Sequence, residues 1–479
     1  MKPVTITIIV SLVIALVLVF LMFRHRSEPG FRNVVKNPEL WREMSEAHQD
    51  IDREIEAAKH WTDDRISAEV EAYLFRTKTR RDALGKARAL EGLGGRVYAP
   101  VIKILGEKSR HMQLVKETGT DLVPEAPFNR ACDLLGDTPP PGTIQHVALF
   151  LNESNKYVRK DAALVIGKVG SSEIVPLLHR ILAGEDEGMR DYALMGLQYA
   201  VINGRLDDTC RKDLFPDLLQ LLTEDKSANY AADLLVEFNA TKAKEFFMSE
   251  ALFTPNSQSL HEALKAMARH NILIPRQRLL PLIQALEAGE LKYPQSYTLA
   301  HALLCLGQNR QSDDLKILER LADHNEERVA KGAAEGLLAY YNLNGFSERT
   351  WDAEQKRGFT SLTPEQQHWA AVFILDSEVN NGGLSQYFFN YSGDRWRLAL
   401  AGLEAMGANE RASILKEAVA KFGAEKPSEN RERRQDQLAK LTRKNETLFN
   451  VLDDRYYESK EVIDVAMTRY VIRNAQAFK

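Results

Sequence analysis

The sequence predicts an all-α protein in three parts: an N-terminal transmembrane helix, a helical solenoid and a small C-terminal helical domain. Three observations predict this fold class. Residues 4–23 are predominantly apolar and carry no charge, helical hydrophobic spacing recurs about every 30–40 residues between 79 and 346, and this period has stopped by residue 362. With 44% hydrophobic and 27% charged residues, the chain has a globular composition, and its 479 residues suffice for two or more domains.

The first part is a run of 20 residues, 4–23, without a charge, a Gly or a Pro. As a helix rising about 1.5 Å per residue, such a run spans the roughly 30 Å hydrocarbon core of a bilayer. A cleavable signal peptide is the alternative, but its apolar region is usually about 7–15 residues and is followed by small residues. This run ends in Leu21, Met22 and Phe23. We therefore predict an uncleaved, single-pass anchor in a bacterial inner membrane.

Basic residues flank the predicted anchor mainly on its C-terminal side, where Arg24, Arg26 and Arg32 follow it. Since Lys and Arg tend to stay on the cytoplasmic side, we expect the large C-terminal part to be cytoplasmic. A short N-terminus with one Lys also fits the opposite orientation. Residues 24–78 are rich in charge and place apolar residues at helical spacing, which predicts a juxtamembrane linker followed by amphipathic helices.

The second part, residues 79–346, reads as repeated pairs of short apolar helices. The clearest unit, 157–184, has the sequence YVRKDAALVIGKVGSSEIVPLLHRILAG, in which Gly170 begins a break between two helices. One helix pair cannot bury its apolar face alone, so a fixed period predicts stacked pairs. The Val-Arg-x-x-Ala-Ala opening and the Pro in the second helix resemble HEAT repeats. That resemblance implies a surface for binding another macromolecule, and because some HEAT-like arrays are enzymes, it leaves open an enzyme with a pocket in the solenoid.

The third part begins with Thr363 and Pro364, a helix cap followed by a first-turn proline. Further on, residues 378–394 read EVNNGGLSQYFFNYSGD, in which the Asn-Asn-Gly-Gly segment predicts a turn. This string resembles the signature of the bacterial DNA-mimic protein C-terminal domain family, and the resemblance covers about 362–479. Leu384 and Tyr391 depart from the family pattern.

The resemblance implies a protein that occupies a DNA-binding protein by imitating the charge of duplex DNA. Such imitation needs a dense acidic face, whereas residues 346–479 contain 20 acidic and 20 basic residues. We therefore expect a membrane-anchored scaffold that binds a protein partner. A regulator that sequesters a DNA-binding protein or toxin is the alternative. The formal net charge of −4 gives no electrostatic case for direct nucleic-acid binding.

Polar residues around the double-glycine turn form the candidate binding site. They are Glu378, Asn380, Gly382, Gly383, Gln386, Tyr387, Asn390 and Ser392. The alternative is that these side chains cap helices and satisfy the turn backbone while the aromatic residues fill a core.

Catalytic chemistry is not expected from the sequence. No nucleophile–base pair is recognisable, because Ser385 and Ser392 have His368 as the one histidine of the domain. Cys132, Cys210 and Cys305 lie far apart and lack the spacing of a metal site or a disulfide framework. We expect no enzyme activity, no metal and no cofactor.

Overall fold

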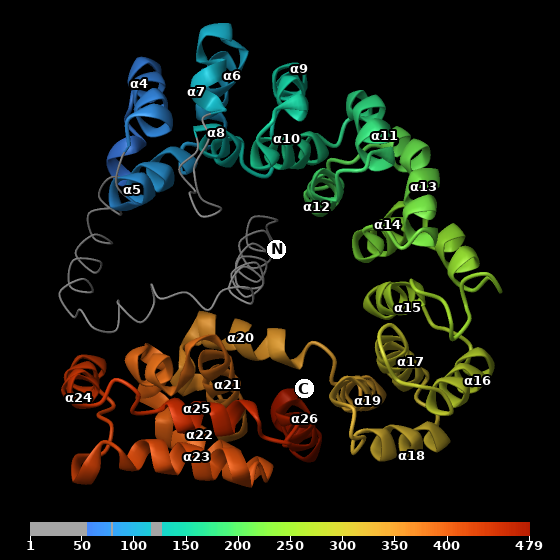
Figure 1. The fold of residues 1–479 in the computed structure, drawn as a ribbon, viewed down its shortest axis with the longest axis vertical. Helices are drawn as coiled ribbons and strands as arrows, with labels where there is room; N and C mark the ends of the chain where they lie inside the picture. Colours follow the sequence, from blue (N-terminus) through green and yellow to red (C-terminus); the bar gives the residue numbers. More distant parts are fainter. Residues whose placement is uncertain (1–54, 78–79, 116–126) are drawn as a thin grey trace. The chain divides into compact units, whose positions relative to one another are not determined.

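The computed structural model describes residues 55–479 apart from 78–79 and 116–126, and all regular structure in these residues is helical (Figure 1). The described residues form two compact units, one that ends at Ala266 and one that begins at Met267. The predicted all-α class is therefore confirmed for the described part of the chain.

The unit that ends at Ala266 is built from short helices. In Figure 1, helices α5, α8, α10, α12 and α14 form one row, and α4, α6, α9, α11 and α13 form a second row. The bounds are α4 Asp63–Phe75, α5 Arg80–Glu91, α6 Tyr98–Gly106, α7 His111–Leu114, α8 Pro127–Leu135, α9 Ile144–Val147, α10 Lys156–Val169, α11 Val175–Ala183, α12 Glu187–Ile202, α13 Asp208–Thr223 and α14 Ala228–Phe247, with 3₁₀ turns between several of them.

The pair α10 and α11 shows why the sequence folds into such pairs. The Asn155 side chain accepts a hydrogen bond from the Tyr157 backbone N–H at 2.9 Å and so caps the start of α10. Gly170 ends α10 in the left-handed conformation, with φ 71°. Pro176 stands in the first turn of α11, where its missing N–H costs no hydrogen bond. The helix break that the sequence predicts at residue 170 is present.

Helices of the same row approach one another closely at glycines. A Cβ atom added at Gly167 would lie 2.3 Å from the Ala193 carbonyl oxygen, and one added at Gly196 would lie 2.3 Å from the Leu164 oxygen. Side chains larger than hydrogen would therefore push α10 and α12 apart. Repeated close stacking of this kind is what an array of helix pairs requires. That the array belongs to the HEAT class stays a prediction.

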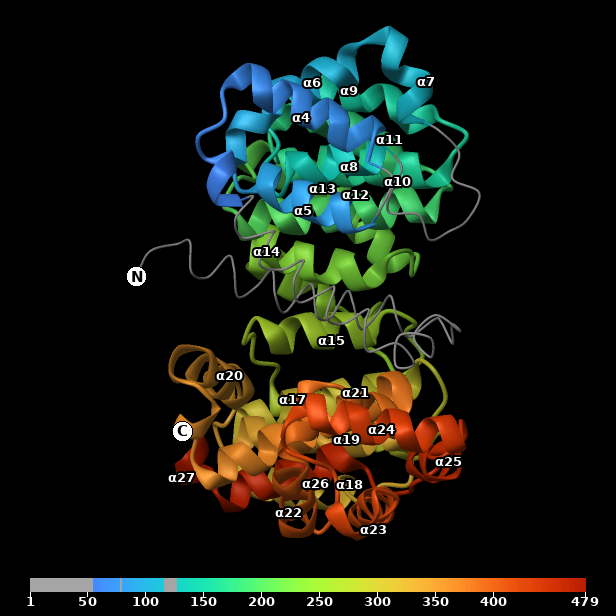
Figure 2. The same cartoon turned by 90° about the vertical axis from the view of Figure 1, so that its left-hand side faces the viewer.

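The unit that begins at Met267 continues with paired helices and ends in a larger helical cluster (Figure 2). Helix α15, Leu260–Arg269, crosses the boundary between the units. The remaining bounds are α16 Arg276–Glu287, α17 Gln295–Asn309, α18 Ser312–Leu321, α19 Glu327–Tyr340, α20 Phe346–Arg357, α21 Pro364–Phe389, α22 Trp396–Met406, α23 Asn409–Ala420, α24 Arg431–Lys444, α25 Asn450–Tyr457, α26 Ile463–Arg473 and α27 Ala475–Phe478.

The C-terminal helices cover the last helix pair of this unit. Helix α26 packs on α19, and Leu343 and Phe346 share one apolar core with Trp369 and Phe478. Ion pairs reinforce the contact, for example Lys331 Nζ with Asp464 Oδ2 at 2.8 Å. The terminal helix pair would otherwise expose an apolar face, so this domain acts structurally as a cap.

The prediction of a transmembrane helix is corrected by the structure. Across 55–77, 80–115 and 127–479, none of the helices has both the length and the apolar character needed to cross a bilayer. The predicted anchor, 4–23, lies outside the described residues. For the described residues the fold class is therefore corrected to all-α without a membrane-spanning helix. The single-pass, inner-membrane localisation with a cytoplasmic C-terminal part rested on the helix alone and is withdrawn with it.

Asp161 on α10 carries a carboxylate in an unfavourable environment. Its Oδ2 is buried without a hydrogen-bond partner among the described residues. Burial, reinforced by the nearby Asp133 carboxylate and opposed by Lys168 and Lys160, raises the pKa of Asp161 from 3.8 to about 7. The folded chain therefore binds this proton more tightly than the unfolded chain does.

We expect the stability contributed by protonated Asp161 to be full below about pH 4 and to be lost as the pH rises toward 7. The variant Asp161→Asn should therefore be more stable than the wild type at pH 8, and this advantage should shrink at pH 4.5. Urea unfolding at both pH values measures it, with the exposed Asp208→Asn as the control. A lower urea midpoint for Asp161→Asn at pH 8 would contradict this assignment.

Candidate functional site

The candidate site is built around a kink inside α21. Thr363 and Gln366 form a reciprocal capping box at the start of this helix. Gly382 and Gly383 leave the helical conformation, and Gly383 has φ 77° and ψ −178°, a region that glycine alone tolerates. A Cβ atom on Gly383 would lie 2.6 Å from Asp453 Oδ2. The predicted turn is therefore a kink between two helical halves rather than a loop.

The Asp453 carboxylate on α25 stabilises the kink by accepting a backbone hydrogen bond. Its Oδ1 accepts a hydrogen bond from the Leu384 backbone N–H at 2.8 Å, which satisfies an amide that the kink frees from the helix. Burial raises the pKa of Asp453 to about 6, although the bond from Leu384 opposes this.

Glu378 connects three of the other predicted residues across the kink. Its carboxylate accepts hydrogen bonds from Gln386 Nε2 at 2.5 Å, from Asn390 Nδ2 at 3.0 and 2.9 Å, and from Ser392 Oγ at 3.2 Å. Each carboxylate oxygen thus accepts two bonds, which fills the acceptor capacity of the group. Because Glu378 lies before the kink and its partners lie after it, these bonds fix the angle between the two halves of α21.

The side chains of two predicted residues make no hydrogen bond to Glu378. Asn380 is exposed and donates to Asp376 Oδ2 at 2.9 Å; Asp376 in turn accepts from Arg411 at 2.8 Å and from the Tyr456 hydroxyl at 3.0 Å. Tyr387 is 1% exposed, and its hydroxyl has no hydrogen-bond partner among the described residues. Burial raises the pKa of Tyr387 far above its usual value.

Arg434 on α24 ties the second half of α21 to the rest of the domain. The side chain is 0% exposed and donates to the carbonyl oxygens of Phe388 at 2.6 Å, Asn390 at 2.8 Å and Ser428 at 2.6 Å. It also pairs with Asp394 Oδ1 at 2.6 Å. A buried guanidinium is tolerated where its donors are all directed at acceptors and its charge is matched.

A pocket of about 530 Å³ opens beside this cluster. Two of the arginines that line it lie over aromatic rings: the Arg395 guanidinium carbon is 3.5 Å from the Phe359 ring centroid, and that of Arg431 is 3.9 Å from the Tyr391 centroid. The lining residues are Ile374, Glu378, Asn390, Tyr391, Ser392, Asp394, Arg395 and Arg431.

The sequence did not reveal Arg434, Arg395 and Arg431 as parts of this site. Arg434 belongs to a stretch of basic residues that is typical of a solvated helix face. Leu438 follows Arg434 by four positions, and residues at this spacing share a helix face. This spacing was the one signal in the sequence that Arg434 lies on the buried face of the helix, as both residues do in the structure.

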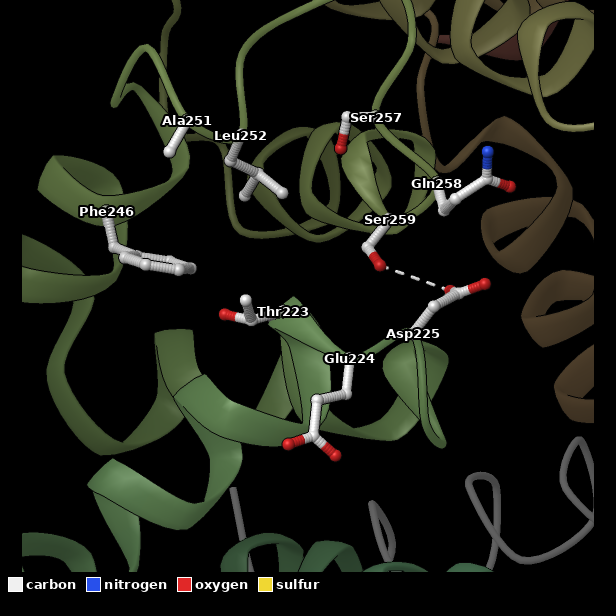
Figure 3. A pocket seen from close by; sticks show the side chains of 9 residues that line it. All are labelled: Thr223, Glu224, Asp225, Phe246, Ala251, Leu252, Ser257, Gln258 and Ser259. Atoms are coloured by element: carbon white, nitrogen blue, oxygen red, sulfur yellow. Dashed lines mark hydrogen bonds between the residues drawn. The ribbon is translucent and has the colours of Figure 1, made fainter.

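The pocket in Figure 3, in the other unit, is less informative. It has a volume of about 340 Å³ and lies where α13 ends, near the segment before α15. Its polar contact is internal: Ser259 Oγ donates to Asp225 Oδ1 at 3.1 Å, while Phe246 and Leu252 present apolar surface. These polar groups do not converge on a common point.

The histidine considered for a nucleophile–base pair lies elsewhere. His368 Nδ1 is 3.1 Å from the Tyr470 hydroxyl, and burial lowers the pKa of His368. Ser392 instead donates to Glu378 and, at 3.2 Å, to the Tyr387 carbonyl oxygen.

Many acidic groups of the C-terminal domain are matched by arginine or lysine. This matters because a surface that imitates DNA must present unneutralised negative charge. The pairs are Glu354–Arg395, Asp376–Arg411, Asp394–Arg434, Glu404–Lys416, Glu417–Arg455 and Glu429–Arg397.

In the described residues, the fold and this site define an all-helical protein of paired helices that ends in a C-terminal domain with a kinked central helix. That domain, residues 360–474, matches the family model described as DMP19-like protein, a DNA-mimic-like family, so the resemblance expected at the C-terminus is confirmed. No curated protein matches the chain. The match indicates a protein-interaction or DNA-mimic role.

Proposed function

We propose that this chain is a protein-binding scaffold, in which the helical array recognises a partner protein and the C-terminal domain supplies a second contact. The observation that carries the proposal is a row of half-buried tyrosines on neighbouring helices of the array: Tyr157 on α10, Tyr192 and Tyr199 on α12, and Tyr230 on α14.

Three neighbouring helices of one row carry these tyrosines. Helix α10 packs on α12, and α12 packs on α14. Burial raises the pKa of Tyr230 to about 12, and the nearby Tyr192 and Tyr199 contribute to this increase. Lysines lie over three of the four rings, with Lys168 Nζ 4.7 Å from the Tyr199 centroid. Tyrosine combines a large apolar ring with a polar end, which is why it is enriched at protein interfaces.

Polar side chains that line the two pockets are engaged in hydrogen bonds within the protein, which supports binding over catalysis. Glu378 is fully used as an acceptor, and the Asp225–Ser259 contact in the other unit is internal. General acid–base catalysis needs a titratable group within reach of a reacting atom. An enzyme of the HEAT-like kind is therefore not part of this proposal.

A second candidate is a regulator that sequesters a DNA-binding protein. The match of residues 360–474 to a DNA-mimic-like family favours it. The ion pairs of the same domain weigh against it, because Glu417 and Arg455, for example, lie 2.7 Å apart and cancel one another's charge. The partner contact of the C-terminal domain is therefore proposed to depend on shape and hydrogen bonding more than on negative charge.

We expect Tyr192→Ala and Tyr230→Ala each to weaken binding of the partner by about 2 kcal/mol, or roughly 30-fold in Kd, because truncating a tyrosine anchor removes much of its buried contact. Affinity for the partner recovered by cross-linking measures the effect. Tyr98→Ala on α6, in the other row of helices, is the matched control and should bind normally. If both array variants bound the partner with unchanged affinity, these tyrosines of the array would not be part of the binding surface.

A further inference from the structure

Helix α24 (Figure 1) carries basic side chains along its exposed face. Arg433, Lys440 and Lys444 are all exposed and stand at positions i, i+7 and i+11 of the helix, with Gln437 between them at i+4. Residues at this spacing share one face of a helix. At a rise of about 1.5 Å per residue, the three cations are spread over roughly 16 Å of helix.

The segment before α24 places a fourth cation beside this face. The Gln437 side chain donates to the Lys426 backbone carbonyl at 3.0 Å and accepts from the Ser428 backbone N–H at 2.9 Å. These two bonds hold the segment against the helix, and Lys426 is exposed. The basic stripe is defined as Lys426, Arg433, Lys440 and Lys444.

The cations of the basic stripe have no ion-pair partner within the part of the chain that the structure describes. Other exposed cations of the same domain are paired, as Lys416 is with Glu404 and Arg455 is with Glu417. The stripe therefore presents positive charge that the domain itself leaves unneutralised.

The basic stripe is also unfavourable for its own helix. Lys440 and Lys444 form a like-charge pair at i, i+4, a spacing at which equal charges destabilise a helix. Arg433 stands in the first turn, near the positive end of the helix dipole, where an acidic residue would be favoured. A charge pattern that the fold does not use, and that costs the helix stability, indicates a surface that serves binding.

The groups around the basic stripe favour a protein over other polyanions. Glu432 and Asp436 are exposed on the adjoining side of α24, where they would repel the closely spaced phosphates of a nucleic acid. The apolar Leu438 is buried in the core of the domain, so this helix has no apolar face to insert into a lipid surface. A protein segment can place carboxylates on the stripe and a base opposite the two acids, and such complementarity fixes its register.

We propose that the basic stripe is the contact of the C-terminal domain with its partner, and that it binds an acidic segment of that protein. The inference rests on the proposed scaffold function and adds the chemistry of the partner surface. The charge is opposite in sign to the acidic face that imitation of DNA requires.

The first test uses the intact chain and three labelled probes: a poly-glutamate peptide, a poly-lysine peptide and duplex DNA. Fluorescence anisotropy at low and at physiological ionic strength gives the Kd of each probe. We expect poly-glutamate to bind most tightly, with an affinity that falls as salt rises, because exposed charges are screened. Absence of poly-glutamate binding would overturn the inference, and tighter binding of DNA would replace the protein segment by a nucleic acid.

A pair of triple variants locates the binding surface. Replacing Arg433, Lys440 and Lys444 together by Gln should weaken poly-glutamate binding roughly tenfold, since several exposed ion pairs are lost at once. The control replaces three exposed cations that already have ion-pair partners, so it removes the same charge: Lys356→Gln, Lys416→Gln and Arg455→Gln. The control should bind poly-glutamate as the wild type does. Equal losses in the two triple variants would assign the binding to net charge and overturn the stripe as its site.

The same variants separate this inference from the scaffold proposal. Cross-linked recovery of the cellular partner depends on the scaffold proposal, whereas the peptide measurement needs no cellular partner. If the partner were recovered equally well with the stripe variant and with the wild type, the stripe inference would fail and the scaffold proposal would stand. If poly-glutamate bound at the stripe but no partner were recovered, the scaffold proposal would fail instead.

Discussion

Replacing Arg434 by methionine should lower the free energy of unfolding of the C-terminal part by about 3–5 kcal/mol, the usual cost of removing one partner of a buried charge pair. The variant leaves Asp394 without its partner at 2.6 Å. It also leaves the carbonyl oxygens of Phe388, Asn390 and Ser428 without the donor that they share. Calorimetry should show the midpoint of the affected transition falling by roughly 6–20 °C.

The neighbouring Arg433→Met is the matched control. Arg433 has the same side chain on the same helix but is exposed, and surface substitutions usually change stability by less than about 0.5 kcal/mol. Similar losses in both variants would show that the charge of α24, and not the buried network of Arg434, stabilises the domain.

The second large effect is expected at the kink. Gly383→Ala places a Cβ atom in a backbone region that costs ~1–3 kcal/mol for residues other than glycine. That atom would lie 2.6 Å from Asp453 Oδ2, and relief of the overlap costs ~1–3 kcal/mol more. Moving Asp453 would also break its bond to the Leu384 N–H and release the angle that Glu378 fixes.

Urea unfolding measures the loss, and Gly289→Ala provides the comparison because a Cβ atom there would make ordinary contacts, the nearest at 3.5 Å. If Gly383→Ala and Gly289→Ala had equal urea midpoints, the backbone geometry assigned to the kink would be incorrect.

The all-helical class and the C-terminal resemblance could be predicted because both depend on local sequence. Apolar spacing of 3.6 residues and breaks such as Gly170 act within a few residues. Glu378, Gln386, Asn390 and Ser392 could be selected for the same reason, since they are separated by no more than 14 positions.

The partners of the site could not be predicted in this way. Arg434 lies 46 positions from Phe388, and Asp453 lies 69 positions from Leu384, so tertiary packing alone brings them together. The transmembrane helix is the prediction that we correct, because none of the described helices is long and apolar enough to cross a bilayer. The burial of the Tyr387 hydroxyl also required the structure, since a buried hydroxyl without a partner among the described residues cannot be recognised in a sequence.

The most direct measurement of the central claim is chemical cross-linking in cells of the intact chain, followed by mapping of the linked residues, with and without excess duplex DNA during recovery. We predict a protein partner whose cross-links fall on α10, α12 and α14 and on residues 360–474, and that remains bound in the presence of DNA. Failure to recover any specific partner with the folded chain would contradict the scaffold proposal, and displacement by DNA would establish the DNA-mimic alternative in its place.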